Sequence, residues 1–420
     1  MKAGRQPAQG SRGNPQFLYF LETFDQPVTP KHSAWSRPLP LSRRAVIDSS
    51  ASQLPPDESI SVGDYFGAIR SFLQETGREV IATVMKGRGE AAPAAHIFRI
   101  FLAKHGEYYH PARVETDSGG RIMQWVVNVA VSSAGKSLLL KEYALLERLN
   151  REFPLSYLPD VYAASETDAG HGRSVALFMG EWLSGFHEFH LTAGASPSEP
   201  ALVLWDPEKG RRQLNSDHTA AIYHQIARIL THYFNLTTFE GIAGWHHAAG
   251  DFVVKADAGR IAVRLITVRD YRPLFRHGPK AAGPVHDIKT LLEALLIFLL
   301  NLSLRTRLDR LDGTGDLAWS GPAAVEATVA GVLVALSRKS APFELPLPVD
   351  QLFRRYLAAC AADDLLEMCR AIAAKAIPLA NPEHPATENR LHEHSAMLAA
   401  VFSRLRPSQH AARFSLKAAR

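Results

Sequence analysis

Histidine and carboxylate side chains gather within one stretch of the chain, residues 244–273. His246, His247 and Asp251 lie near its start, and Asp270 lies near its end. Imidazole titrates near neutral pH and ligates metals, and carboxylate oxygens hold Mg²⁺. These residue types predict His246, His247 and Asp251 as catalytic groups, and Asp251 and Asp270 as metal ligands.

A β-hairpin is predicted to bring these groups together. Two apolar, β-rich runs at 252–255 and 261–268 are separated by an Asp-x-Gly turn at 257–259. Glycine accepts the positive φ that a tight turn needs, so this pattern is a hairpin signal. Because the turn lies at the far end, His246, His247 and Asp251 should project from the same edge as Arg269 and Asp270.

A purely structural role for the same residues remains open. The two histidines would then bond backbone carbonyls and fix the shape of their loop. Asp251 and Asp270 would cap a turn and form surface ion pairs with Arg269 or Arg272.

The patterning of the chain changes from strands to helices near 180–185, where two glycines bound a short linker. Strands are predicted before the linker, with one helix among them. Almost everything after it is predicted to be helical apart from the hairpin. The predicted strands are 80–85, 95–103, 112–115, 123–131, 161–165 and 174–179, and the predicted helices are 61–77, 136–153, 216–236, 285–307, 322–337, 349–374 and 388–404. The fold class predicted is α+β with two lobes.

The predicted organisation has four parts. An extended, partly disordered arm covers 1–57, with an aromatic island at 17–21 that docks on the body. A β-rich N-lobe with a preceding helix covers 58–183. A mainly helical C-lobe covers 184–405, and a basic tail covers 406–420.

This order of elements resembles the protein-kinase-like fold, in particular the aminoglycoside and lipopolysaccharide (Kdo/heptose) kinase branch, over roughly residues 95–305. Residues 141–149 look like the helix whose glutamate, here Glu142, pairs with a strand lysine. Residues 177–185 look like the strand that enters the adenine-binding hinge, which contains Glu181. Residues 287–292 look like the aspartate-led helix that supports the catalytic loop.

The resemblance implies ATP and Mg²⁺ as cofactors, and it places Asn128, Glu142 and Glu181 at cofactor-binding positions. Asp270, close to the family's metal-binding position, is a further cofactor-binding candidate in a rearranged site. The catalytic motifs are degenerate, however. The catalytic aspartate of the family falls at His246, its second metal-binding aspartate at Thr267, and its strand lysine at Asn128. Charge stabilisation by Mg²⁺ and basic groups is most of phosphoryl-transfer catalysis, so these departures affect the chemistry directly.

Three functions are therefore kept open. One is a phosphotransferase with an atypical site, acting on a nucleotide and a small-molecule or lipid-linked sugar substrate. The alternative is a pseudokinase, a binding or regulatory scaffold without phosphoryl transfer. A third is a structural or interaction protein with a vestigial site.

Composition is that of a soluble globular protein, with 46% hydrophobic and 21% charged residues in 420. The net charge of +5 is spread along the chain without a dense basic block, so no nucleic acid partner is expected. No apolar run reaches the length of a membrane span. The expected location is cytoplasmic, with peripheral attachment to the inner membrane through the basic arm left open.

The two cysteines, Cys360 and Cys369, fall in one predicted helix. They are too far apart along its axis for a relaxed disulfide, so buried and inert thiols are predicted.

Overall fold

The computed structural model divides the chain into two compact units, each described here by itself. Unit 1 comprises Met1–Arg148 and Pro159–Ser184, and unit 2 comprises Leu149–Leu158 and Gly185–Arg420. The structure describes residues 15–21, 26–40, 59–89, 97–106, 108–118, 120–153, 155–194, 200–245, 248–257, 259–274, 287–313, 315–376 and 387–406. His246 and His247 therefore lie outside the described residues.

Unit 1 is built on a six-stranded sheet with the order β1-β2-β3-β4-β6-β5. Its strands are β1 (Gln16–Leu21), β2 (Ile97–Leu102), β3 (His110–Ser118), β4 (Arg121–Ala130), β5 (Val161–Gly170) and β6 (Arg173–Glu181). Neighbouring strands are antiparallel, except that β1 pairs in parallel with β2. The aromatic island of the N-terminal arm is β1, an edge strand of this sheet.

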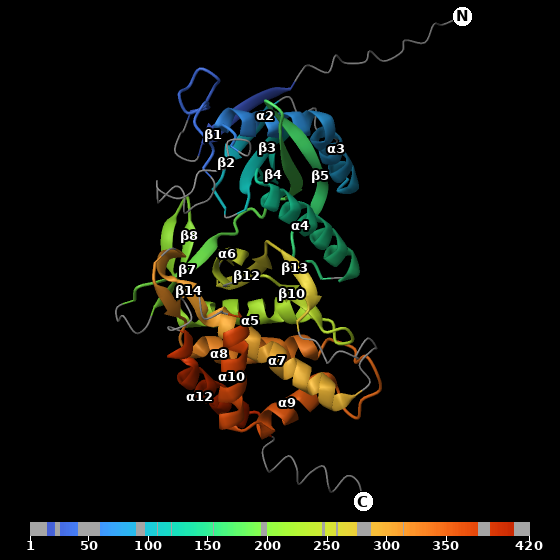
Figure 1. Ribbon diagram of the computed structural model, residues 1–420, viewed down its shortest axis with the longest axis vertical. Coiled ribbons are helices and arrows are strands. Elements are labelled where there is room, and N and C mark those ends of the chain that lie inside the picture. Colours follow the sequence, from blue (N-terminus) through green and yellow to red (C-terminus); the bar gives the residue numbers. More distant parts are fainter. Residues whose placement is uncertain are drawn as a thin grey trace, which may run out of the picture. The chain divides into compact units, whose positions relative to one another are not determined.

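Helices cover one face of the sheet (Figure 1). They are α2 (Val62–Phe72), the π-helical turn η1 (Leu73–Gly77) and α3 (Arg78–Gly87). The core beneath them includes Tyr65, Phe66 and Phe72 from α2 and Phe98 and Trp125 from the strands. This face therefore carries the main hydrophobic core of unit 1.

The strand predicted at 80–85 is wrong, because these residues belong to α3. Val80, Ile81 and Val84 favour a strand by type, but Ile81 and Met85 are four residues apart and are the two that the helix buries. Packing of that helical stripe overrides the β-branched composition.

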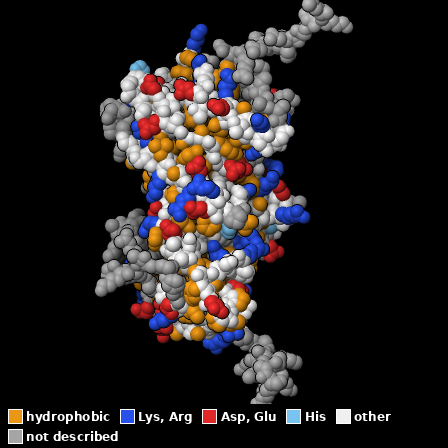
Figure 2. Space-filling model, turned by 90° about the vertical axis from the view of Figure 1, so that its right-hand side faces the viewer, with side chains coloured by type: hydrophobic (Ala, Val, Ile, Leu, Met, Phe, Trp, Pro, Cys, Tyr) orange, Lys and Arg blue, Asp and Glu red, His pale blue; other side chains and the backbone are white. Residues whose placement is uncertain are grey.

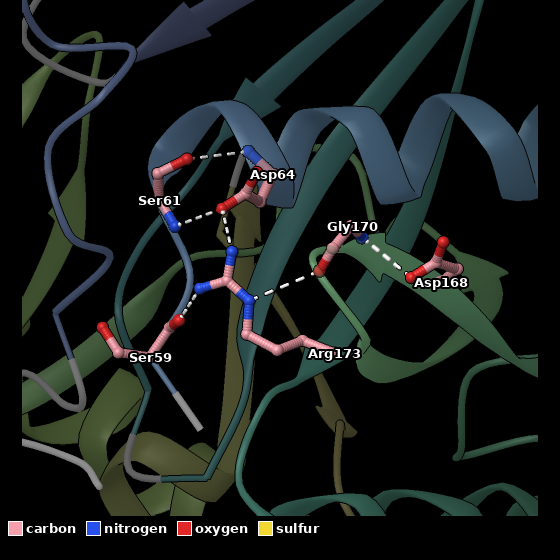
Figure 3. Close-up of polar contacts among 6 residues, drawn as sticks. All are labelled: Ser59, Ser61, Asp64, Asp168, Gly170 and Arg173. Atoms are coloured by element: carbon pink, nitrogen blue, oxygen red, sulfur yellow. Dashed lines mark hydrogen bonds and ion pairs between the residues drawn. The ribbon is translucent and has the colours of Figure 1, made fainter. Parts of the chain in front are cut away.

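Hydrogen bonds from Arg173 link the start of α2 to the turn between β5 and β6 (Figure 3). Its guanidinium donates to the Ser59 carbonyl, to Asp64 Oδ2 at 3.1 Å and to the Gly170 carbonyl at 3.4 Å. Asp64 and Ser61 also form a reciprocal capping box, which satisfies backbone N–H groups at the start of the helix. One arginine thus joins two parts of unit 1 that are distant in sequence.

Helix α4 (Ser133–Glu152) follows β4 directly, as predicted for 136–153. Leu139 and Leu146 are fully buried, and the Tyr143 ring lies 6.1 Å from the ring of Phe178 on β6. Lys136, in its first turn, donates to Ser174 Oγ at 3.0 Å. This helix positions Glu142.

Unit 2 is mainly helical (Figure 1). Its helices of eleven residues or more are α5 (Ser216–His232), α7 (Ile288–Arg307), α8 (Pro322–Leu336), α9 (Val349–Ala359), α10 (Ala362–Ala376) and α12 (Leu391–Ser403). Helices α5 and α8 approach closely at Gly331, where a Cβ atom would lie 2.2 Å from the His224 carbonyl oxygen. Only glycine fits this contact.

The single helix predicted at 349–374 is wrong, because α9 ends at Ala359 and Cys360 is extended, with ψ 134°. The two cysteines thus lie on separate segments, and both are free. Burial raises the pKa of the Cys369 thiol to about 12 and also raises that of Cys360. Cys369 is buried as predicted, whereas Cys360 is only partly buried, and the inertness of both thiols stays a prediction.

Short strands in unit 2 correct the expectation that almost everything after the linker is helical. They are the three-stranded sheet β7 (Glu188–Thr192), β8 (Ala201–Asp206) and β9 (Gly210–Gln213), and the pairs β10 (Glu240–Ala243) with β13 (Asp270–Pro273) and β14 (Leu308–Arg310) with β15 (Leu317–Trp319). Strands of three to six residues give too few alternations to be recognised by period.

The predicted hairpin is confirmed as β11 (Phe252–Asp257) and β12 (Arg260–Leu265). Asp257 pairs with Arg260, and Gly259 takes a φ of +81° in the turn. The second strand ends at Leu265 rather than at residue 268. The short helix α6 (Ala248–Asp251) leads into β11.

The predicted fold class is confirmed. The molecule is α+β, with a β-rich N-terminal unit followed by a mainly helical unit that carries a hairpin. Within the described ranges, no helix combines the length and the apolar character needed to cross a membrane.

Candidate functional site

Asp251 lies at the mouth of the hairpin in unit 2, immediately before β11. Its carbonyl oxygen accepts from Ile266 N at 2.9 Å, which continues the β11–β12 ladder by one further bond. Its carboxylate is nearly buried, with 6% of the side chain exposed, and Oδ1 lies 2.9 Å from Nη2 of Arg269. The hairpin therefore presents Asp251 as part of an ion pair.

A second guanidinium contributes to the charge around Asp251. Arg305, near the end of α7, stacks over the Trp245 ring with its Cζ 4.2 Å from the ring centroid. Burial lowers the pKa of Arg305 to about 10, and the negative charge of Asp251 partly opposes this shift. The Asp251 carboxylate thus lies in the field of two arginines.

Asp270 is the first residue of β13, opposite Ala243 of β10. Its Oδ2 accepts from Arg272 Nε at 2.6 Å. Gly244, with a φ of +76°, brings the backbone so close that a Cβ there would lie 3.5 Å from those of Arg269 and Asp270. The β10–β13 pair therefore sets the position of both residues.

The structure brings Asp251 against Arg269, as the hairpin argument predicts for one edge of the hairpin. It also gives each of the two candidate metal ligands, Asp251 and Asp270, an arginine partner. Among the described residues, no group of three or more His, Cys, Asp or Glu side chains is arranged to hold a metal ion. The metal role of these aspartates stays a prediction.

Thr267 lies between β12 and β13, where the resemblance expects a second metal-binding aspartate. Its Oγ1 is buried and has no hydrogen-bond partner among the described residues. A hydroxyl lacks the negative charge that draws Mg²⁺, so this position adds no metal-binding carboxylate.

Glu142 on α4 is a buried carboxylate of unit 1, with 1% of the residue exposed. The hydroxyl of Tyr109, just before β3, donates to Glu142 Oε2. Asn128 lies on β4 opposite Pro111 and Phe178, and the β4 sequence contains no lysine. The Tyr109 phenol is therefore one partner of this glutamate, and β4 supplies no lysine to it.

Glu181 ends β6, where the resemblance expects a hinge. Its backbone N–H donates to the Asp160 carbonyl at 2.8 Å, and its Oε2 accepts from Asp160 N at 3.4 Å. These bonds fix the start of β5 against the end of β6. Its cofactor-binding role, like those of Asn128 and Glu142, stays a prediction.

Three residues near the candidate site residues Asp251 and Glu142 were not recognised from the sequence: Tyr109, Trp245 and Arg305. Trp245 and Arg305 are 60 positions apart and meet only through the packing of α7. Tyr109 stands one position before a strand, and no local pattern links it to α4. Arg269 was identified only as a structural partner for the aspartates.

No protein-family model and no curated protein matches the chain. Among solved structures, WaaP in complex with acyl carrier protein matches with a TM-score of 0.31 and 12% sequence identity, over 63% of this chain and 83% of that chain. A likeness at this level assigns neither a family nor a function to the chain.

Proposed function

We propose that this chain is a pseudokinase-type protein: a kinase-like scaffold that binds a ligand or partner without Mg²⁺-dependent phosphoryl transfer. The observation that carries the proposal is the ion pair between Asp251 and Arg269 at 2.9 Å, with the carboxylate nearly buried.

Charge at the hairpin mouth supports this proposal. Asp251 and Asp270 are matched by Arg269 and Arg272, and Arg305 adds a further positive charge. A divalent cation would enter a region of excess positive charge and would have to displace a guanidinium from a buried carboxylate. Removing one partner of such a pair costs about 3–5 kcal/mol. The described residues do not fit a Mg²⁺ site in this arrangement.

Unit 1 gives independent support. A strand lysine that neutralises phosphate charge is part of the phosphoryl-transfer machinery in kinases. Here Asn128 stands at that strand position, and the Tyr109 hydroxyl bonds to Glu142. This phenol is neutral and supplies no positive charge for a phosphate, and neither does Asn128.

A phosphotransferase acting on a small molecule or lipid-linked sugar is the second candidate. One observation favours it: the hairpin and the β10–β13 pair bring Asp251 and the Arg269–Asp270 segment together at one edge. ATP and Mg²⁺ would be its cofactors, with Asp251 and Asp270 as ligands only after both arginines had moved.

Release or transfer of the γ-phosphate of labelled ATP separates the two candidates. The proposal predicts no release or self-labelling above a protein-free blank, with Mg²⁺ or Mn²⁺ present. An Asp251→Asn variant is the matched control for contaminating kinases, because any activity it retains does not come from this site. Activity in the wild-type protein that Asp251→Asn abolishes would overturn the proposal and establish the second candidate.

A further inference from the structure

A stacked row of side chains crosses the face of the unit 1 sheet opposite to the face covered by α2. The row, called here the aromatic–arginine row, consists of Phe20, Phe101, Arg113 and Trp182. Phe20 pairs with Phe101 in register, and Phe101 pairs with Arg113. Phe98, Ile100 and Leu102 are in the main core, so Phe101, which alternates with them along β2, points to the other face.

Flat groups follow one another along the row. The rings of Phe20 and Phe101 stack with their centroids 4.6 Å apart and an interplanar angle of 15°. The Arg113 guanidinium lies over the Phe101 ring, with its Cζ 4.3 Å from the ring centroid. The same Cζ lies 5.9 Å from the centroid of the Trp182 ring. Two aromatic contacts thus limit the position of the guanidinium.

Nη1 of this guanidinium faces a carboxylate, whereas Nε and Nη2 have no hydrogen-bond partner among the described residues. Among the described residues Arg113 makes no side-chain hydrogen bond, and its ionic contact is Glu115 Oε1 at 3.4 Å, with 32% of the Arg113 side chain exposed. Glu115 Oε1 also accepts from Gln124 Nε2 at 3.0 Å, and Gln124 Oε1 accepts from Ser184 Oγ at 2.6 Å. The carboxylate is therefore held by neighbours of its own.

Charge on this part of the face favours an anion. Arg99 stands opposite Glu115 in the β2–β3 register, so two arginines surround one carboxylate. Side chains directly opposite in an antiparallel pair lie close enough to interact. Beside Arg113, an incoming oxyanion would therefore meet two arginines and one carboxylate, Glu115.

We propose that the aromatic–arginine row binds the phosphate group of a small phosphorylated ligand through Arg113. A guanidinium offers two parallel N–H donors that match two oxygens of a phosphate, and it remains charged at neutral pH. The contacts with Phe101 and Trp182 reduce the freedom that Arg113 would lose on binding. Glu115 contacts Nη1 and leaves Nε and Nη2 as the pair of donors for the phosphate.

The test is a titration with inorganic phosphate and with glycerol phosphate, followed by tryptophan emission and by calorimetry. Trp182 borders Arg113, so binding should change emission in a saturable way, and Trp182→Phe should remove that change while calorimetry still detects binding. Glycerol and potassium chloride at matched ionic strength should have no saturable effect. Tighter binding of glycerol phosphate than of phosphate would identify an esterified ligand, and the reverse order would identify the free ion.

Two lysine variants make the result specific. Arg113→Lys keeps the positive charge but removes the pair of parallel N–H donors. It should weaken phosphate binding about tenfold or more, because a charged hydrogen bond is lost. Arg211→Lys is the matched control: Arg211 also stacks on a tryptophan, Trp205 at 4.7 Å, but donates to Asp312 at 3.0 Å, and its substitution should leave binding unchanged. Thermal unfolding establishes that both variants are folded.

The inference fails if the wild-type protein shows no saturable phosphate binding, if chloride gives the same response, or if Arg113→Lys binds as tightly as wild type. It stands apart from the proposed function, because the row lies in unit 1 and involves none of the hairpin residues of unit 2. Active γ-phosphate transfer would overturn the proposed function and leave the phosphate titration unaffected.

Discussion

At the scale of single residues, the partner of each carboxylate decides what that carboxylate can do. The sequence offered Asp251 and Asp270 as metal ligands, and it also offered ion pairs with Arg269 or Arg272 as the alternative. Both aspartates do have arginine partners. Residue types cannot decide between these roles, because the choice depends on side-chain directions that only the β10–β13 pair and the turn at Gly244 determine.

Arg269→Gln should destabilise unit 2 because it leaves the Asp251 carboxylate buried without this partner. The expected loss is about 3 kcal/mol in the free energy of unfolding. Arg272→Gln is the control, since Arg272 is largely exposed and its pair with Asp270 should contribute at most about 1 kcal/mol. Urea unfolding of both variants gives the comparison, and equal losses would contradict the burial argument.

Tyr109→Phe should destabilise unit 1 by about 1–2 kcal/mol, because the buried Glu142 loses the phenol as a hydrogen-bond donor while the ring is retained. The exposed neighbour Tyr108 provides the control: Tyr108→Phe should change stability by less than about 0.5 kcal/mol. Chemical denaturation measures both. If Tyr109→Phe proves neutral, the phenol does not hold α4.

At the scale of elements, long periodic segments were predictable and short ones were not. The helix at 136–153 and the hairpin at 252–265 follow from period and turn chemistry. Residues 80–85 have the composition of a strand but are held as a helix by what Ile81 and Met85 pack against. The break between α9 and α10 at Cys360 has no proline or glycine to mark it.

Two glycine substitutions test the helix contacts. Gly331→Ala should destabilise unit 2 by about 1–3 kcal/mol, because its Cβ would lie 2.2 Å from the His224 carbonyl oxygen on α5. Gly67→Ala, on α2, meets no atom within 4 Å and should stabilise the helix by about 0.5–1 kcal/mol. Opposite shifts in Tm are the expected result. A neutral Gly331→Ala would mean that α5 and α8 are not packed as closely as described.

At the scale of the whole molecule, the change from a β-rich to a helical unit was readable from patterning around the linker, and the division into units falls after Ser184. The surface is less informative. On the face seen in Figure 2, basic and acidic side chains lie among one another with hydrophobic side chains between them, and the described residues there form no continuous basic stripe. Overall charge therefore identifies no partner.

Buried histidines should make the molecule acid-sensitive. Burial lowers the pKa of His110 and His394 to about 3 and that of His232 to about 4, from 6.5. As pH falls below 6.5 the unfolded chain takes up protons that the folded chain refuses, so stability is lost progressively toward about pH 3.

His394→Gln isolates one of these groups, since the amide oxygen can still accept from Arg307. The drop in Tm between neutral pH and about pH 5 should be smaller in this variant than in wild type. Equal drops would show that His394 does not contribute to the acid sensitivity.

We propose that Asp251 is held by arginine rather than available to a metal. Calorimetric titration with Mg²⁺ and Mn²⁺, with and without ATP, tests it on the wild-type protein, Arg269→Gln and Asp251→Asn. The account predicts no binding at this site in wild type or in Asp251→Asn, and a gain of divalent-cation binding in Arg269→Gln, where the carboxylate is released. Binding in wild type that Asp251→Asn abolishes would contradict it.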